Sequence, residues 1–191
     1  MQRRIAVDLD EVIVDFIPAF LKFFNDRYGR NISFADITSY NLWESGIGET
    51  KEEAIKYVLE FCSTDSFTYV PLVRGSKEAI NQLAGKYQVN VVTSRTEGLR
   101  EKTDEFLRRH FPNTPLVVNY ASDFYGGNNQ TKAQICKALG VDVVIEDNLS
   151  YAFDCSKSGL IVYLLNKPWN QGILPENIKR VESWQEIVRE L

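Results

Sequence analysis

The sequence predicts an α/β fold: a doubly wound, mostly parallel sheet that carries a small inserted α-helical cap. Apolar strand-like runs alternate with helical patterns through the second half of the chain, which is the arrangement of right-handed βαβ units. Between a first apolar run at residues 5–7 and a helix expected from Ser76 lie about 60 residues without a strand pattern, too many for a single crossover. We therefore predict a core domain over residues 1–14 and 74–191, and a helical cap over residues 15–73.

Composition narrows the class of protein. The chain has 191 residues, enough for one core with a small insertion, and its net charge of −4 argues against a nucleic-acid polymer as partner. The spacing of Cys62, Cys136 and Cys155 fits neither a zinc site nor a disulfide framework. No apolar run approaches the roughly 20 residues of a membrane span. We expect a cytoplasmic protein with a small-molecule partner and no membrane contact, and the sequence leaves a homodimer open.

Periodicity and stop signals define the elements of the predicted cap. Aromatic residues at helical spacing predict a helix that starts near Phe16 and ends at Gly29. Residues 31–48 lose this periodicity, which predicts a loop that contains Tyr40 and Trp43. Most of the aromatic side chains on the helix are expected to form the core of the cap, whereas those in the loop are better placed to contact a substrate.

Capping residues and apolar runs define the remaining elements. Thr50 with Glu53, and Ser183 with Glu186, have the spacing of capping boxes. The predicted helices cover about 50–62, 76–86, 97–110 and 131–139, a short stretch near Ala152 and a last segment after Ser183. The predicted strands cover 89–92, 115–118, 143–145 and 160–165, and residues 167–170 are expected to form a turn. The loop at 120–130 is either a lid or a plain connection.

Polar residues collect where the predicted strands end. In chain order they are Asp8, Asp10, Thr93, Lys132, Glu146 and Asp147. Each has an ordinary explanation when taken alone, such as an exposed helix lysine or a turn. However, open α/β sheets bind ligands at the carboxyl ends of their strands, so these side chains are expected to meet. Close carboxylates repel one another and require a cation or a shared proton, and hard carboxylate oxygens suit Mg²⁺.

This order of motifs resembles the haloacid dehalogenase (HAD) superfamily of phosphatases. The family places a DxD after its first strand, a Thr or Ser at the end of the second, a Lys on a helix and an acidic pair after the fourth. The matching residues are Asp8-Leu9-Asp10, Thr93, Lys132 and Glu146-Asp147. The resemblance implies a HAD-like Rossmannoid core. A response-regulator receiver uses similar residues, but its Lys comes last and it lacks a cap-sized insertion.

The resemblance implies Mg²⁺-dependent hydrolysis of a phosphomonoester. Asp8 would attack phosphorus and form an aspartyl-phosphate, while Asp10 would give a proton to the leaving alcohol and later accept one from water. The implied phosphate-binding residues are Thr93, Ser94 through its backbone N–H, and Lys132. The implied metal ligands are Asp8, Asp10 through its backbone carbonyl, Asp147 and Glu146.

Within the superfamily the chain is most similar to the 5'(3')-deoxyribonucleotidases. The similarity rests on the cap and on Val12, Asp15-Phe16, Val92-Thr93-Ser94-Arg95 and Lys167-Pro168-Trp169-Asn170. It implies a nucleoside monophosphate substrate. The expected pocket contacts are Phe16, Tyr40, Trp43 and Arg95.

Two residues depart from the pattern of that family. Glu11 stands where a Gly is usual, and Glu146 where an Asp is usual.

The alternatives left open are a phosphatase for another small phosphometabolite, a phosphomutase, and a phosphate- or nucleotide-binding module without turnover. His110, the sole histidine, stands at a helix end, where a charge or cap is expected rather than a catalytic group.

Overall fold

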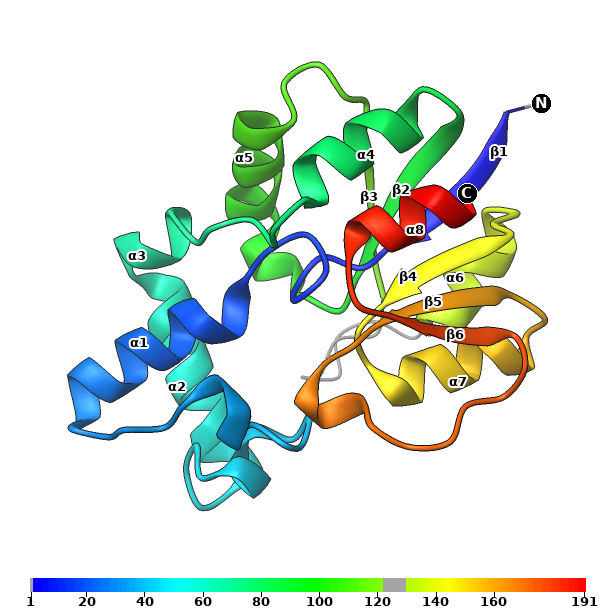
Figure 1. Ribbon diagram of the computed structural model, residues 1–191. Coiled ribbons are helices and arrows are strands. Elements are labelled where there is room, and N and C mark those ends of the chain that lie inside the picture. The colour runs from blue at the N-terminus through cyan, green and yellow to red at the C-terminus, as the bar shows by residue number, and fades with distance from the viewer. Residues whose placement is uncertain (1, 122–129) are drawn as a thin grey trace.

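A parallel sheet organises the molecule. The computed structural model describes residues 2–121 and 130–191, and within them the sheet has six strands in the order β3-β2-β1-β4-β5-β6 (Figure 1). The strands are β1 (Arg3–Val7), β2 (Tyr87–Thr93), β3 (Val117–Tyr120), β4 (Val143–Glu146), β5 (Ile161–Leu165) and β6 (Ile178–Val181). Every neighbouring pair is parallel. The strand order changes direction between β1 and β4, so the binding crevice is expected at their carboxyl ends.

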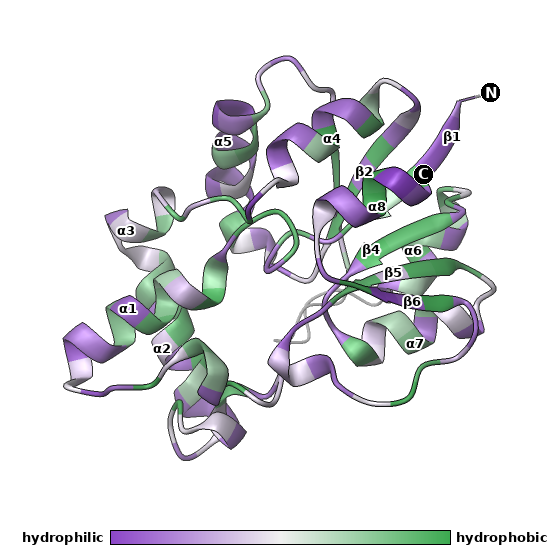
Figure 2. Ribbon diagram, in the orientation of Figure 1, coloured by the Kyte–Doolittle hydropathy of each residue, from purple (hydrophilic) through white to green (hydrophobic). Residues whose placement is uncertain are grey.

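Helices cover both faces of the sheet, which confirms the doubly wound prediction. The helices are α1 (Phe16–Tyr28), α2 (Lys51–Ser63), α3 (Asp65–Thr68), α4 (Ser76–Ala84), α5 (Arg100–His110), α6 (Lys132–Ala138), α7 (Leu149–Lys157) and α8 (Trp184–Glu190). Alternate strand residues face opposite sides: Val7 packs in one apolar cluster with residues of α4, α5 and α8, and Ala6 in a second with residues of α6 and α7. The central strands β4 and β5 are accordingly apolar in Figure 2.

The residues between β1 and α4 form helices that lie to one side of the sheet (Figure 1). They comprise α1, α2, α3 and two short 3₁₀ helices, Phe34–Asp36 and Leu42–Ser45. Phe20 and Phe61 are fully buried here with ring centroids 5.9 Å apart, so aromatic packing holds α1 against α2. The division into core (1–14 and 74–191) and cap (15–73) stays a prediction that this arrangement supports.

At the N-termini of two helices, the glutamate side chains bind a different backbone group from the one expected in a capping box. The side chains of Thr50 and Ser183 cap α2 and α8 as expected. The Glu53 carboxylate, however, accepts the N–H of Glu49, one residue before the cap. Glu186 likewise accepts the N–H of the residue before Ser183. Each glutamate therefore binds the backbone one residue further back than predicted.

Some boundaries also differ from the prediction. The strand predicted at 115–118 lies at Val117–Tyr120, and the helix predicted from 97 begins as a 3₁₀ turn before α5. Strand β6 was not predicted, because its four residues, Ile178–Val181, enclose a Lys and an Arg at the sheet edge. The question of a lid at 120–130 concerns residues that mostly lie outside the described ranges. No helix in the described ranges has the length and apolar character of a membrane span.

The last helix anchors the loop that follows β1. Trp184 of α8 is fully buried, and its indole N–H donates to the carbonyl of Val12 at 2.8 Å. We expect Trp184→Phe to lower the free energy of unfolding by about 2–4 kcal/mol, because it removes this donor and leaves a cavity. Urea denaturation followed by circular dichroism measures the change.

The control for this prediction is Ile173→Ala, since Ile173 is 95% exposed and its loss is expected to change the free energy of unfolding by less than about 0.5 kcal/mol. Equal stabilities of the two variants would contradict the anchoring role of Trp184.

Candidate active site

Asp8 stands at the strand end nearest the switch in strand order. Its backbone N–H donates to the carbonyl of Ile145, so the pairing of β1 with β4 continues to this residue. Its side chain is buried, and its Oδ1 lies 2.7 Å from Nζ of Lys132. Thr131 caps α6 and Lys132 is the first helical residue. The lysine is 4% exposed, so it is a buried partner of Asp8 rather than an ordinary surface lysine.

The same ammonium group binds a second carboxylate. Nζ of Lys132 lies 2.7 Å from Oε1 of Glu146, and the ring of Tyr151 lies 4.5 Å from it. The other oxygen of Glu146 accepts the backbone N–H of Asp147 at 2.8 Å. Both oxygens of Glu146 are thus engaged by groups of the protein.

The buried acids have the electrostatics of a cation site. Carboxylate oxygens of Asp8, Glu146 and Asp147 all lie within 4.8 Å of one another. Burial raises the pKa of Asp8 to about 8, and the charge of Glu146 adds to the effect while Lys132 opposes it. Burial and the charge of Asp8 raise the pKa of Asp147 to about 8 as well. A divalent cation would relieve this repulsion, and the donor set of hard oxygens fits one.

The same acidic cluster shifts the pKa of Lys132 in the direction that favours its charged form. Burial lowers its pKa, but the charges of Asp8 and Glu146 outweigh burial and hold the pKa of the ammonium well above its ordinary value. The lysine is therefore cationic at every pH at which the protein would be studied.

Two residues after β5 hold Asp147 in place. The indole N–H of Trp169 donates to Oδ2 of Asp147 at 2.9 Å, and the side-chain amide of Asn170 donates to its carbonyl at 2.7 Å. In the sequence, Trp169 and Asn170 belong to a predicted turn and to one of the motifs shared with the deoxyribonucleotidases, but neither was predicted to contact Asp147. Their position just beyond the carboxyl end of a strand next to β4 was the available signal, since that edge is where the acids gather.

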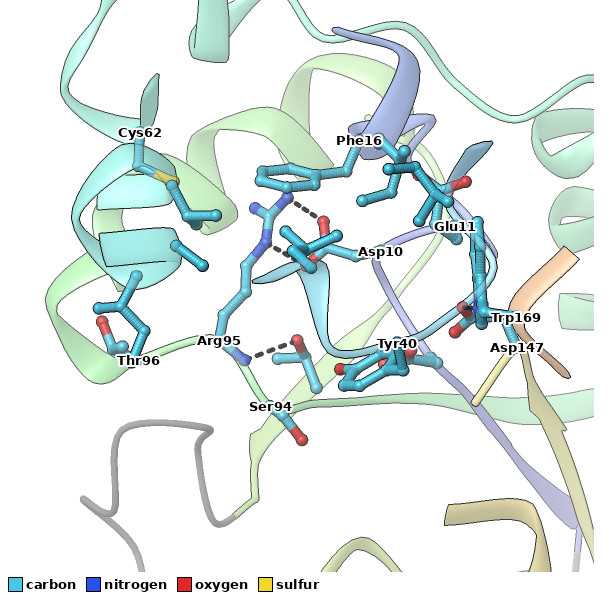
Figure 3. Close-up of a pocket in the computed structure, with 18 of the residues that line it drawn as sticks. Asp10, Glu11, Phe16, Tyr40, Cys62, Ser94, Arg95, Thr96, Asp147 and Trp169 are labelled. Atoms are coloured by element: carbon cyan, nitrogen blue, oxygen red, sulfur yellow. Dashed lines mark hydrogen bonds and ion pairs between the residues drawn. The ribbon is translucent and has the colours of Figure 1, made fainter. Parts of the chain in front are cut away.

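Arg95 is paired rather than solvated. Its guanidinium donates to both oxygens of Asp10, from Nε at 2.9 Å and from Nη2 at 2.6 Å (Figure 3). Its carbon Cζ lies 5.0 Å from the ring centroid of Phe67 in α3, and its Nη1 donates to Thr103. The bidentate contact fixes the orientation of the Asp10 carboxylate, which stays partly exposed.

Thr93 and Ser94 stand at the end of β2. Thr93 is buried, and its Oγ1 accepts the backbone N–H of Arg95 at 3.1 Å. Oγ of Ser94 is buried, and no residue in the described ranges offers it a hydrogen bond. The predicted phosphate donor at Ser94 is its backbone N–H.

One pocket of about 160 Å³ brings these residues together (Figure 3). The sequence-predicted residues that line it are Asp8, Asp10, Phe16, Tyr40, Trp43, Thr93, Ser94, Arg95, Lys132 and Asp147. Glu146 lies behind Lys132, and His110 closes α5 with its ring against Phe106. The remaining lining is mostly apolar, including Ile37, Leu42 and Phe67.

The aromatic contacts fall at different ends of the pocket. Tyr40 packs against Tyr151. The residue as a whole is 40% exposed, but desolvation of its phenol group raises its pKa well above the usual value, with added effects from Tyr151, Asp147 and Asp8. Tyr40 therefore lies by the acids. Phe16 packs against Phe67 with ring centroids 6.3 Å apart and belongs to the apolar end.

Glu11 is buried beside the acidic loop in an unusual conformation. Its φ is 60°, and among the described residues it is the only non-glycine with a positive φ. Burial raises the pKa of its carboxyl to about 7, with Lys167 as the largest opposing influence. A glycine adopts a positive φ at little energetic cost because it has no Cβ, which gives a physical reason for the glycine that is usual at this position.

Comparison with known proteins places this site in a family. Residues 2–191 match the model of the family described as 5' nucleotidase, deoxy (pyrimidine), cytosolic type C protein. A nucleotidase of Clostridium acetobutylicum is 27% identical, covering 97% of this chain and 92% of the relative. A 5'(3')-deoxyribonucleotidase of Bacillus subtilis is 26% identical, covering 100% of this chain and 99% of the relative.

The fold has counterparts among solved structures. YfnB of Bacillus subtilis, assigned as a HAD hydrolase and crystallised with bound magnesium, superposes with a TM-score of 0.67 at 14% identity, covering 99% of this chain and 98% of that one. The family match covers nearly the whole length of the chain. The HAD-like sheet is consistent with that match, and so are the acids, the Thr and the Lys that meet at one edge of the sheet. The chain has the fold of HAD hydrolases, belongs to the 5' nucleotidase, deoxy (pyrimidine), cytosolic type C family and is a hydrolase of phosphoric monoesters.

Proposed function

We propose that the chain is an Mg²⁺-dependent 5'(3')-(deoxy)ribonucleotidase that dephosphorylates nucleoside monophosphates through an aspartyl-phosphate on Asp8. The observation that carries the proposal is the cluster of Asp8, Lys132 and Asp147 at one end of a pocket whose other end is apolar and aromatic. A phosphate group fits the charged end, and a nucleobase fits the apolar end. The deoxyribonucleotidase relative supports this substrate class.

In the proposed first step, a carboxylate oxygen of Asp8 attacks phosphorus and the bond from phosphorus to the ester oxygen breaks. Asp10 gives its proton to the departing alcohol. In the second step Asp10 takes a proton from water, the water oxygen attacks phosphorus, and the bond to Asp8 breaks to release inorganic phosphate. The alternation requires Asp10 to stay close to the reacting atoms, and its contact with Arg95 serves this orientation. This bidentate contact favours the carboxylate, so one of its two hydrogen bonds would have to open while Asp10 carries the proton.

Positive charge and hydroxyl groups would hold the phosphate. The Lys132 ammonium offsets the charge of Asp8 and offers donors to the phosphate oxygens. Thr93 would add a hydroxyl donor and Ser94 its backbone N–H. Asp8, Asp147 and the backbone carbonyl of Asp10 would hold Mg²⁺, which would neutralise the charge of the phosphate and the acids. Glu146 would act through Lys132, because both its oxygens are already engaged.

The substrate proposal is tested by phosphate release from a panel of nucleoside monophosphates, sugar phosphates and a generic aryl phosphate, with Mg²⁺ and with chelator. We expect metal-dependent release that favours deoxynucleotides, since the apolar end of the pocket offers a ring surface to a base.

Asp8→Asn should lower kcat by at least about 1000-fold.

The matched control is Asp142→Asn, because Asp142 forms an exposed ion pair with Arg3 away from the pocket. It should keep wild-type kcat. Comparable turnover of sugar phosphates and nucleotides would contradict the nucleotide pocket and favour a phosphatase of other small metabolites. Turnover only in the presence of a phosphorylated activator would favour a phosphomutase.

The raised pKa values of Asp8 and Asp147 predict how stability depends on pH. Each rises from 3.8 to about 8 in the folded chain, so between these values the folded state keeps protons that the unfolded chain releases. Without metal, stability should therefore fall as pH rises from about 4 through about 8. Mg²⁺ binds the ionised carboxylates, so its stabilising effect should grow over the same interval.

Thermal unfolding in chelator and in Mg²⁺, at intervals from about pH 5 to about pH 9, checks this expectation. A melting-temperature shift on adding Mg²⁺ that stays constant with pH would contradict a metal site built on Asp8 and Asp147.

A further inference from the structure

Glu11 holds a strained conformation that only specific contacts can sustain. A left-handed backbone is unfavourable for any residue with a Cβ, and a buried carboxylate is unfavourable without partners. The two costs fall on the same residue, directly after Asp10. Such strain is kept where the surroundings compensate for it, and it is common at functional sites.

The partners of Glu11 come from two distant parts of the chain. Oε1 accepts the backbone N–H of Ile17 in the first turn of α1 at 2.5 Å. Helix α1 has no acidic residue in its first turn, and Asp15 makes no side-chain cap there, so Glu11 takes that place. Oε2 lies 3.3 Å from Nζ of Lys167, whose side chain is 12% exposed.

Lys167 begins the segment that holds Asp147. Its backbone N–H donates to the side chain of Asn170, and Asn170 in turn binds the carbonyl of Asp147. Trp169 in the same segment donates to the Asp147 carboxylate. The Lys167 ammonium also lies 5.8 Å from the ring of Phe34, between the first helices and this segment. A continuous set of contacts therefore runs from α1 through Glu11 and Lys167 to Asp147.

We propose that Glu11 and Lys167 are a positioning pair, which sets the segment 167–170, and through it the proposed metal ligand Asp147, relative to the Asp10 loop and α1. The inference rests on the proposed function, since it assigns the pair a role in holding Mg²⁺. Glu11 lines the pocket, but Ile17 and Lys167 engage its two carboxylate oxygens. Each acts through the groups that it orients.

A plain charge effect makes a different prediction from positioning. Glu11 adds negative charge near Asp147 and Lys167 adds positive charge, as their opposite effects on the carboxyl of Asp147 indicate. Charge alone would make loss of Glu11 weaken Mg²⁺ binding and loss of Lys167 strengthen it. Positioning makes both losses weaken it, because either one frees the segment that orients Asp147.

The experiment measures the Kd of the full chain for Mg²⁺ by calorimetry, and kcat and KM for a nucleoside monophosphate. The variants are E11G, which also relieves the backbone strain, K167M and the double variant. We expect about tenfold weaker Mg²⁺ binding and a lower kcat in each single variant, with KM changed less than about twofold. The double variant should be within about twofold of the weaker single one, because the pair acts as a unit.

Two controls separate positioning from loss of folding. K179M breaks the exposed ion pair of Lys179 with Glu190 and should leave the Kd for Mg²⁺ unchanged. E11Q keeps a side-chain oxygen that can accept the N–H of Ile17 but loses the negative charge. Its melting temperature should therefore lie closer to that of the wild type than the melting temperature of a variant without this acceptor. Its Mg²⁺ binding should still be weakened.

Tighter Mg²⁺ binding by K167M would overturn the inference and leave a charge effect. Wild-type binding by K167M, or by E11G and E11Q together, would also overturn the inference, because positioning requires each loss to weaken binding. A wild-type chain that neither binds Mg²⁺ nor needs it for turnover would overturn the proposed metal site itself, and this inference with it. The two failures are therefore distinguishable.

Discussion

One ammonium group shared by two buried carboxylates determines the geometry of the active site. Nζ of Lys132 lies 2.7 Å from both Asp8 and Glu146, and Asp147 lies beside them. Three buried carboxylates with a single lysine retain excess negative charge, which is unfavourable unless a cation joins them. The ends of β1 and β4 and the start of α6 must therefore converge at one point. The strand order provides this, because β1 and β4 are neighbours where the order changes direction.

The parts of the site that could be predicted from sequence are those placed by secondary structure. Asp8, Thr93 and Asp147 each follow an apolar run, and Lys132 begins a helix, so periodicity alone located them at one edge of a sheet. The alternation of strands and helices likewise predicted the doubly wound fold. Strand β6 was not predicted, because two of its four residues are charged and the apolar pattern is therefore weak.

Side-chain partners across the fold could not be predicted in this way. Arg95 binds Asp10, Trp169 binds Asp147 and Glu11 pairs with Lys167, and each contact depends on packing that leaves no periodic signal. Both residues that depart from the family pattern make contacts of this kind. Glu146 pairs with the buried Lys132, and Glu11 pairs with the partly buried Lys167.

The nucleophilic role of Asp8 is the central claim, and trapping its phosphorylated form tests it most directly. In the Asp10→Asn variant, the phenolate of an aryl phosphate needs little help to leave as the phosphoryl group passes to Asp8, whereas the attack by water lacks its base, so the acyl phosphate should accumulate. Borohydride reduction followed by mass spectrometry locates it. We expect reduction of the acyl phosphate to convert Asp8 to homoserine. Release of the aryl alcohol with Asp8 unmodified, or with the modification at another residue, would contradict it.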